Sequence, residues 1–189
     1  MKRIAVYCGS SKGERPEYAE AAEKLGTAIA QAKIELVYGG GMLGLMGIVA
    51  NAVLKHGGHV IGVIPEKLVI KEVVHDTLPD LRVVKNMHER KALMAELADG
   101  FIALPGGFGT FEEFFEVLTW SQLGWHPKPL GLLNIAGFYS HLITFLKHTE
   151  TEGFIKPKHR ELVLVENDPE KILQRLREFK PVSETKWIK

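Results

Sequence analysis

A glycine-rich run followed by two carboxylates is the feature of this sequence that most suggests chemistry. The run PGGFGT occupies residues 105–110, and Glu112 and Glu113 follow it. Glycines permit turns that leave backbone N–H groups facing an anion, and a helix beginning directly afterwards adds the positive end of its dipole. A carboxylate placed directly on a phosphate would repel it, so Glu113 should lie nearer the sugar of a bound nucleotide. That position suits a glycosidic reaction, which builds positive charge on the sugar ring, better than phosphoryl transfer.

The same residues have a structural alternative. Thr110 and Glu113 match a capping box, in which the Thr110 side chain caps a helix and Glu113 stands at its third position. This pattern predicts a helix over residues 111–123. A capping role alone would then account for Glu113.

Two further glycine-rich runs follow predicted strands, GSSKG at residues 9–13 and GGGMLG at residues 39–44. In an open parallel sheet, ligands bind beyond the carboxyl ends of the strands. The candidates for supporting a phosphate are Gly9, Ser10, Gly40, Gly41 and Gly106. Residues 39–44 also match the dinucleotide fingerprint, but they follow the second strand, and no acidic residue ends the next strand before Glu66. The sequence contains no P-loop motif, which disfavours ATP hydrolysis of that type.

A second helix start carries two basic residues. In NMHERK at residues 86–91, Asn86 is a candidate cap and Glu89 has the spacing of a capping box. Arg90 and Lys91 then fall near the first turn, where an exposed cation opposes the helix dipole by about 0.3–1 kcal/mol. A bound anion would offset this cost, and the Arg90 guanidinium can hold a phosphate or carboxylate through two hydrogen bonds. The alternative is that both side chains extend into solvent.

These runs belong to an alternation of short apolar segments and longer helical patterns. The predicted strands cover residues 4–8, 35–38, 59–64, 82–85, 100–104, 130–133 and 162–165. The predicted helices cover residues 16–32, 45–56, 87–98, 111–123, 138–152 and 169–179. Such alternation indicates parallel strands with crossover helices on both faces of the sheet. We therefore predict one α/β domain over residues 1–180, with a doubly wound, mostly parallel, Rossmann-like sheet. Residues 65–80 are predicted to be a loop at the strand ends, and residues 181–189 a loose tail or an arm onto a neighbouring chain.

Composition limits the kinds of partner. The 189 residues include 24 basic and 23 acidic side chains, and this formal net charge of +1 gives no basic excess for nucleic acid or an anionic membrane. No run of about 18 apolar residues is present, and the N-terminal apolar run is too short for a signal peptide. The single cysteine, Cys8, can form neither an intrachain disulfide nor a cysteine metal cluster. We expect a cytoplasmic protein that holds its phosphate ligand in a local site.

The run PGGFGT with Glu113, preceded by Arg90 and Lys91, resembles the Lonely Guy family. These are cytokinin riboside 5′-monophosphate phosphoribohydrolases, often mislabelled as lysine decarboxylases. The resemblance covers nearly the whole chain, including GLMG at residues 44–47 and TWSQLG at residues 119–124. It implies hydrolysis of an N6-substituted adenosine 5′-monophosphate to the free base and ribose 5-phosphate, with Arg90 and Glu113 catalytic. The substrate contacts it implies are Glu72, Arg90, Lys91, Gly107, Phe108, Gly109, Thr110, Phe111, Glu112, Glu113 and Thr119. It further implies a homodimer with active sites near the subunit interface, and no metal or organic cofactor.

On this interpretation, Glu113 stabilises the positive charge on the ribose and orients or deprotonates the attacking water, while Arg90 holds the phosphate or ribose. Thr119 stands six residues beyond Glu113, roughly 120° around the helix, so it would reach the same ligand from another direction or another subunit. Trp120 and Trp125 are candidates for the base pocket, although core or dimer packing explains them equally well. Two alternatives stay open: a hydrolase acting broadly on nucleoside 5′-monophosphates, and a nucleotide-binding or cofactor-carrier protein without catalysis.

Overall fold

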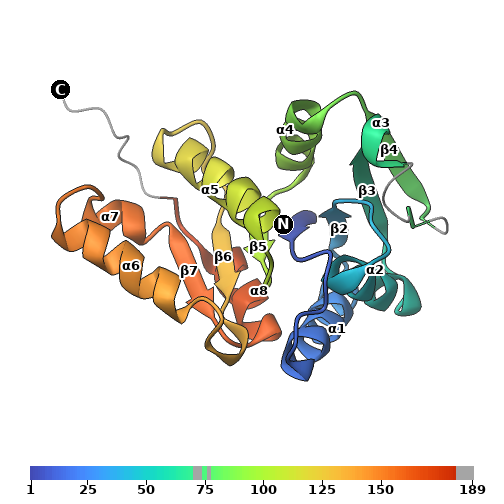
Figure 1. Cartoon of the computed structure of the whole chain (residues 1–189), viewed down its shortest axis with the longest axis horizontal. Helices are drawn as coiled ribbons and strands as arrows, with labels where there is room; N and C mark the ends of the chain where they lie inside the picture. Colours follow the sequence, from blue (N-terminus) through green and yellow to red (C-terminus); the bar gives the residue numbers. More distant parts are fainter. Residues whose placement is uncertain (70–73, 76–77, 182–189) are drawn as a thin grey trace.

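Seven short apolar segments form a single parallel sheet (Figure 1). The strands are β1 (Arg3–Tyr7), β2 (Glu35–Tyr38), β3 (Val60–Pro65), β4 (Asp80–Val84), β5 (Phe101–Ala103), β6 (Leu130–Leu133) and β7 (Val163–Glu166). Their order across the sheet is β4-β3-β2-β1-β5-β6-β7, and every neighbouring pair is parallel. The structure is a computed structural model that describes residues 1–69, 74–75 and 78–181. The predicted doubly wound, Rossmann-like fold is confirmed.

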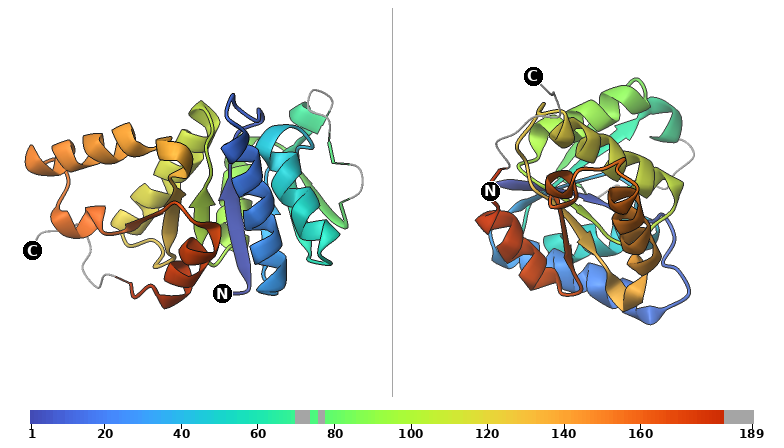
Figure 2. Two further views of the ribbon diagram at one scale, coloured as in Figure 1. Left: turned by 90° about the horizontal axis from the view of Figure 1, so that it is seen from below. Right: turned by 90° about the vertical axis from the view of Figure 1, so that its left-hand side faces the viewer.

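Helices cover both faces of the sheet (Figure 2). One face is covered by α1 (Pro16–Gln31), α2 (Gly44–Lys55) and α8 (Pro169–Glu178), with α1 packed against the other two. The opposite face is covered by α4 (Met87–Leu97), α5 (Phe108–Gln122) and α6 (Ser140–Thr151). Short helical turns complete the connections: α3 (Glu66–Val69), η1 (Ile135–Gly137) and α7 (Pro157–Arg160). No helix in the described part of the chain is both long and apolar enough to cross a membrane.

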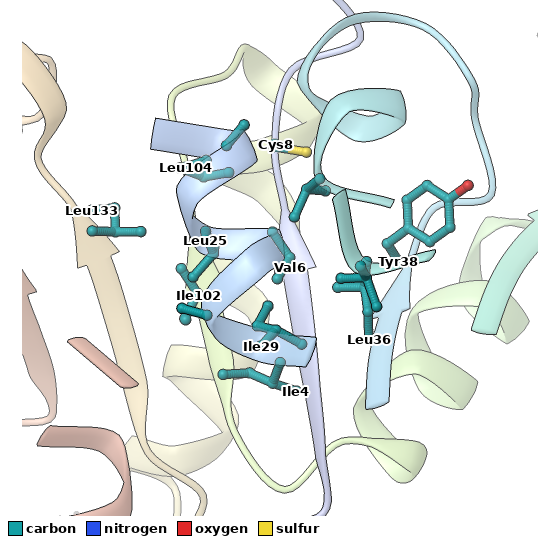
Figure 3. Packing of buried hydrophobic residues seen from close by; sticks show 14 of the residues in the cluster. Ile4, Val6, Cys8, Leu25, Ile29, Leu36, Tyr38, Ile102, Leu104 and Leu133 are labelled. Atoms are coloured by element: carbon teal, nitrogen blue, oxygen red, sulfur yellow. The ribbon is translucent and has the colours of Figure 1, made fainter. Parts of the chain in front are cut away.

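The central strand β1 shows how the sequence builds two cores. Side chains alternate between the two faces of a strand, so Ile4, Val6 and Cys8 lie on one side of the sheet. They pack there with Leu25 and Ile29 of α1 (Figure 3). The intervening residues of β1 contribute to the core beneath α4 and α5. Burial of each such aliphatic side chain contributes about 1.5–3 kcal/mol to the stability of the fold. The two cores therefore hold the strands, and the loops at their ends, in place.

The predicted strands and most predicted helices agree with the structure to within two residues at each end. Two predictions were wrong. Residues 65–80 are not simply a loop, since α3 (Glu66–Val69) lies within them and β4 begins at Asp80. The predicted helix over residues 111–123 begins earlier, because α5 starts at Phe108. Residues 182–189 of the predicted tail lie outside the described part of the chain.

The chain reverses its direction of travel across the sheet at β1. The strands β2, β3 and β4 lie on one side of β1, while β5, β6 and β7 lie on the other. The connections leaving the carboxyl ends of β1 and β5 therefore diverge and leave a crevice between them. At this point the Gly9 N–H donates to the Pro105 carbonyl at 3.0 Å, which joins the glycine-rich runs at residues 9–13 and 105–110.

Candidate active site

A cleft of about 270 Å³ lies at the carboxyl ends of β1 and β5. The loop after β1 contributes Cys8, Gly9 and Ser10. Helices α2 and α4 contribute Met46, Met87 and Arg90. The first two turns of α5 and its preceding residue contribute Gly107, Phe108, Gly109, Thr110, Glu112 and Glu113. The fold thus brings together residues from two glycine-rich connections, from helix α2 and from the basic start of α4.

Arg90 is buried and held by backbone carbonyl groups. Its Nε donates to the Val63 carbonyl at 3.0 Å, and its Nη2 donates to the Gly39 carbonyl at 3.1 Å. A Cβ at position 39 would lie only 2.1 Å from Arg90 Nη2, so the arginine passes this point because residue 39 is glycine. Both carbonyl contacts leave Nη1 directed toward the cleft, where it lies 4.0 Å from Glu113 Oε1. The alternative that the Arg90 side chain extends into solvent is wrong.

The start of α4 explains how Arg90 reaches this position. The Asn86 side chain accepts a hydrogen bond from the Glu89 N–H at 3.0 Å, which confirms Asn86 as the cap. Glu89 reaches back to accept from the Lys85 N–H at 3.0 Å. Met87 stands three residues before Arg90 on the same helix face, and its sulfur lies 3.7 Å from Arg90 Nη1.

Glu113 lies on α5 with its side chain 12% exposed, opposite an Arg90 side chain that is 9% exposed. Burial raises the pKa of Glu113 to about 7, although the positive charge of Arg90 acts in the opposite direction. A carboxyl group with this pKa exchanges a proton readily near neutral pH, which suits general acid–base chemistry. The structure therefore pairs an anchored guanidinium with a carboxyl group poised between its two protonation states.

Gly107, not Thr110, stands at the N-cap of α5. The Phe111 N–H is bonded to the Gly107 carbonyl at 3.1 Å, so the amide groups of Phe108, Gly109 and Thr110 belong to the open first turn. Thr110 is instead buried beneath the turn. A Cβ at position 106 would lie 2.1 Å from Thr110 Oγ1, so this close approach requires glycine there. The capping-box explanation of Glu113 is wrong, because the helix begins one turn earlier than Thr110 would place it.

Lys91 is buried beside Arg90, but its charge is directed toward α5. Its Nζ contacts Glu112 Oε1 and lies 3.0 Å from Glu116 Oε1. Burial lowers the pKa of Lys91, but the hydrogen bonds to these carboxylates outweigh burial and leave the pKa above its usual value. Two residues expected to contact substrate, Lys91 and Glu112, therefore contact each other here.

Other predicted site residues lie away from this cleft. The Thr119 hydroxyl donates to the Phe115 carbonyl at 2.7 Å on the exposed side of α5. Phe111 packs edge-on against Tyr139, with ring centroids 6.3 Å apart. Glu72 lies outside the described residues.

Of the residues predicted to support a phosphate, some line a cavity and others do not. Gly9 and Ser10 line both the cleft and a second cavity of about 280 Å³, whereas Gly106 lines only the second cavity. The Gly40 carbonyl accepts from the His75 N–H at 3.2 Å, and Gly41 forms an isolated bridge with Val74. Neither Gly40 nor Gly41 is among the residues that line these two cavities.

Three residues of the cleft were not among the predicted site residues, and one aromatic pair considered for the site lies elsewhere. Cys8, Met46 and Met87 line the cleft. Met87 could have been predicted to lie in the cleft, since it stands three residues before Arg90 and so on the same face of the helix. Trp120 and Trp125 lie 6.2 Å apart between ring centroids and away from the cleft, with Trp125 70% exposed. Among the described residues, no group of three or more His, Cys, Asp or Glu side chains is arranged to hold a metal ion.

Both a protein-family model and individual plant proteins match most of this chain. A family model described as "Possible lysine decarboxylase" matches residues 46–176. A cytokinin riboside 5′-monophosphate phosphoribohydrolase of Arabidopsis thaliana is 49% identical over 96% of this chain and 83% of its own length. A second enzyme of that name from the same plant is 48% identical over 97% of this chain and 81% of its own. One from Oryza sativa subsp. japonica is 49% identical over 96% of this chain and 75% of its own.

Solved structures resemble the chain more distantly. The molybdenum cofactor carrier protein of Chlamydomonas reinhardtii superposes with a TM-score of 0.72 at 22% identity, over 94% of this chain and 99% of its own. A molybdenum cofactor binding protein of Rippkaea orientalis superposes with a TM-score of 0.72 at 23% identity, over 94% and 97% of the two chains. At these identities the likeness establishes a shared fold.

Proposed function

The chain belongs to the family of the "Possible lysine decarboxylase" model, which includes the Lonely Guy phosphoribohydrolases, and on this premise we propose that it hydrolyses nucleoside 5′-monophosphates. The bond broken is the N-glycosidic bond, and the products are the free base and ribose 5-phosphate. The substrates we propose are adenosine 5′-monophosphates with a substituent on N6, because the relatives at about half identity are named for cytokinin nucleotides.

The observation that carries this proposal is the position of Glu113 relative to the first turn of α5. The open amides of Phe108, Gly109 and Thr110 offer a place for a phosphate at the positive end of the helix. Glu113 follows Thr110 by three residues, roughly 4.5 Å further along the helix axis at 1.5 Å per residue. A phosphate on the amides would therefore place the sugar, rather than the phosphate, beside the Glu113 carboxylate.

Arg90 and Glu113 divide the chemistry between them. Cleavage of the N-glycosidic bond makes the ribose ring resemble an oxocarbenium ion, and an ionised Glu113 stabilises that charge. With a pKa of about 7, the same carboxylate can accept a proton from the attacking water. Arg90, fixed by two carbonyl contacts, holds the phosphate or a ribose hydroxyl group with Nη1.

Binding of the phosphate contributes to catalysis although it lies away from the reacting bond. Fixing the phosphate orients the ribose carbon against Glu113 and the water, so remote binding energy lowers the barrier. A riboside without the phosphate lacks this anchor. We therefore expect the nucleotide to be a substrate and the corresponding riboside to react far more slowly.

The remaining members of the expected substrate set are part of the same proposal. Glu72, Lys91 and Thr119 are proposed to contact the ligand once it is bound, with Thr119 approaching from a second subunit. We further propose a cytoplasmic homodimer that needs no metal or organic cofactor. Light scattering at the chain concentration of the assay tests the dimer, since a mass equal to one 21.1 kDa chain would contradict it.

The experiment that tests the function is a chromatographic assay of base release. The purified protein is incubated with AMP, with N6-isopentenyladenosine 5′-monophosphate and with the riboside of each. Release of base from a nucleotide but not from its riboside supports the proposal, and the relative rates rank the substrates. Tight binding of nucleotide without release of base would instead favour the carrier alternative.

A further inference from the structure

A three-member ion cluster joins the helices that carry the proposed catalytic pair. Lys91 on α4 contacts Glu112 on α5 and lies 3.0 Å from Glu116 on the same helix. The Lys91 side chain is 10% exposed, and the Glu116 side chain is 26% exposed. The Glu116 atom that does not face Lys91, Oε2, is buried and has no hydrogen-bond partner among the described residues. Glu116 is therefore partly buried, and its carboxylate faces Lys91 of α4.

The cluster runs parallel to the proposed catalytic pair. Arg90 and Lys91 are adjacent on α4, while Glu112 and Glu116 stand four residues apart and share one face of α5. Glu113 follows Glu112 by one residue, about 100° around the helix, and faces Arg90 across the cleft. The contacts of Lys91 therefore bridge the two helices beside the point where Arg90 meets Glu113.

Two kinds of contact hold α4 near α5: the apolar core that both helices share, with Met94 of α4 and Phe114 of α5 among its members, and the ion cluster near their N-terminal ends. The backbone of α4 packs mainly on β1, β2 and β3, whereas α5 packs on β1 and β5. Figure 1 shows the two helices over different parts of the sheet. Charged contacts near these N-terminal ends join Arg90 to Glu113 and Lys91 to Glu112 and Glu116. Glu112 and Glu116 face Lys91, whereas Glu113 faces Arg90 Nη1 at 4.0 Å.

We propose that Glu116 is a positioning residue: paired with Lys91, it holds α5 so that Glu113 faces Arg90 across the sugar site. The proposal rests on the hydrolase function proposed above. Glu116 does not line the cleft, so it acts through Lys91 and Glu113 and not on the substrate itself.

The charges around Glu113 give this role a distinctive signature. The groups that face it are Arg90 and Lys91 from α4, Glu112 and Glu116 from its own helix, Tyr7 from β1, and Cys8 just after β1. Among them, Arg90 and Lys91 favour the ionised form of Glu113, while Glu112 and Glu116 disfavour it. Tyr7 is neutral near pH 7, because burial raises its pKa well above the usual value. Burial raises the pKa of the Cys8 thiol, which is therefore neutral near pH 7. Removing Glu116 or Lys91 breaks the same ion pair but changes the field at Glu113 in opposite directions.

The test compares the pH dependence of kcat in Glu116→Gln and Lys91→Met, with N6-isopentenyladenosine 5′-monophosphate as substrate. We expect Glu116→Gln to lower kcat on the order of tenfold with little change in KM, as misplacement of a reacting group does. The acidic limb is the part of the profile where kcat rises with pH as Glu113 ionises. It should move to lower pH in Glu116→Gln, which removes a charge that raises the pKa of Glu113, and to higher pH in Lys91→Met, which removes a charge that lowers it. Glu116→Asp, which keeps the charge, should keep the acidic limb near that of the wild type.

A matched control separates positioning from general loss of an ion pair. Glu166 is 22% exposed and pairs with Arg175 at 2.7 Å, away from the cleft, so Glu166→Gln should retain the wild-type kcat and pH profile. The proposal is overturned if Glu116→Gln behaves like Glu166→Gln, or if the acidic limbs of Glu116→Gln and Lys91→Met move together. An inactive wild type would instead overturn the hydrolase function.

Discussion

Replacing Glu113 by glutamine should make the protein more stable at alkaline pH while removing its activity. The Glu113 carboxyl is buried in the cleft, and burial disfavours its ionised form more strongly than Arg90 favours it. Glutamine has nearly the same shape and carries no charge. Arg90 keeps its contacts with the Val63 and Gly39 carbonyl groups in the variant. The substitution therefore removes a destabilising charge from a position that is otherwise well packed.

The magnitude follows from the pKa of Glu113. This pKa rises from 4.5 to about 7 on folding, and each unit corresponds to about 1.4 kcal/mol. The unfolded chain therefore loses its proton at lower pH than the folded protein does. Ionisation costs the folded wild type nothing below pH ~4.5, an increasing amount between pH ~4.5 and ~7, and about 3 kcal/mol above that range. Glu113→Gln removes the pH-dependent cost.

Thermal and urea unfolding at pH 4.5 and pH 8 measure this difference. At pH 8 we expect the free energy of unfolding of Glu113→Gln to exceed that of the wild type by about 3 kcal/mol, or about 6–12 °C in Tm for a chain of this size. At pH 4.5 the two proteins should agree closely. Glu166→Gln, which removes a charge that is paired with Arg175 outside the cleft, should gain nothing at pH 8. A Glu113→Gln variant that is no more stable than the wild type at pH 8 would refute the assignment of Glu113 as a destabilised carboxylate.

Two further predictions concern the active cleft. If ionised Glu113 is the reactive form, kcat/KM should rise with pH through about 7 and then level off, and a rate that falls through the same range would assign Glu113 as a proton donor instead. Gly39→Ala should lower kcat/KM on the order of a hundredfold with the fold retained, because its Cβ would stand 2.1 Å from Arg90 Nη2 and displace the guanidinium. The control is Gly100→Ala, outside the cleft, whose Cβ would meet the flexible end of Met1 at 3.0 Å and the Pro129 ring at 3.2 Å. Equal activity of both variants would contradict the role of Gly39.

The sequence predicted those parts of the structure that depend on local pattern. Apolar runs such as β2 and β6 were placed with the correct bounds, because burial on both faces of a parallel sheet requires nearly continuous apolar residues. Asn86 was identified as a cap from its residue type and its spacing to Glu89. The order of strands at the crevice brings together Arg90 and Glu113, the pair that the family resemblance implied to be catalytic.

Features that depend on contacts between distant elements were not predictable from such patterns. The start of α5 was misplaced because Phe108 and Gly109 are weak helix formers, and glycine costs about 1 kcal/mol in a helix relative to alanine. Packing of Thr110 against position 106 overrides that preference. Likewise, nothing in the sequence shows that Lys91 meets Glu116, since this contact depends on where α4 and α5 cross the sheet.

The measurement that tests the central claim most directly is the yield of both products from one nucleotide. Free base and ribose 5-phosphate are quantified over time from N6-isopentenyladenosine 5′-monophosphate, with the wild type and with Glu113→Gln at saturating substrate. The account predicts equal amounts of base and ribose 5-phosphate from the wild type, and bound but intact nucleotide in the variant. Release of inorganic phosphate and riboside, or equal turnover by Glu113→Gln, would contradict it.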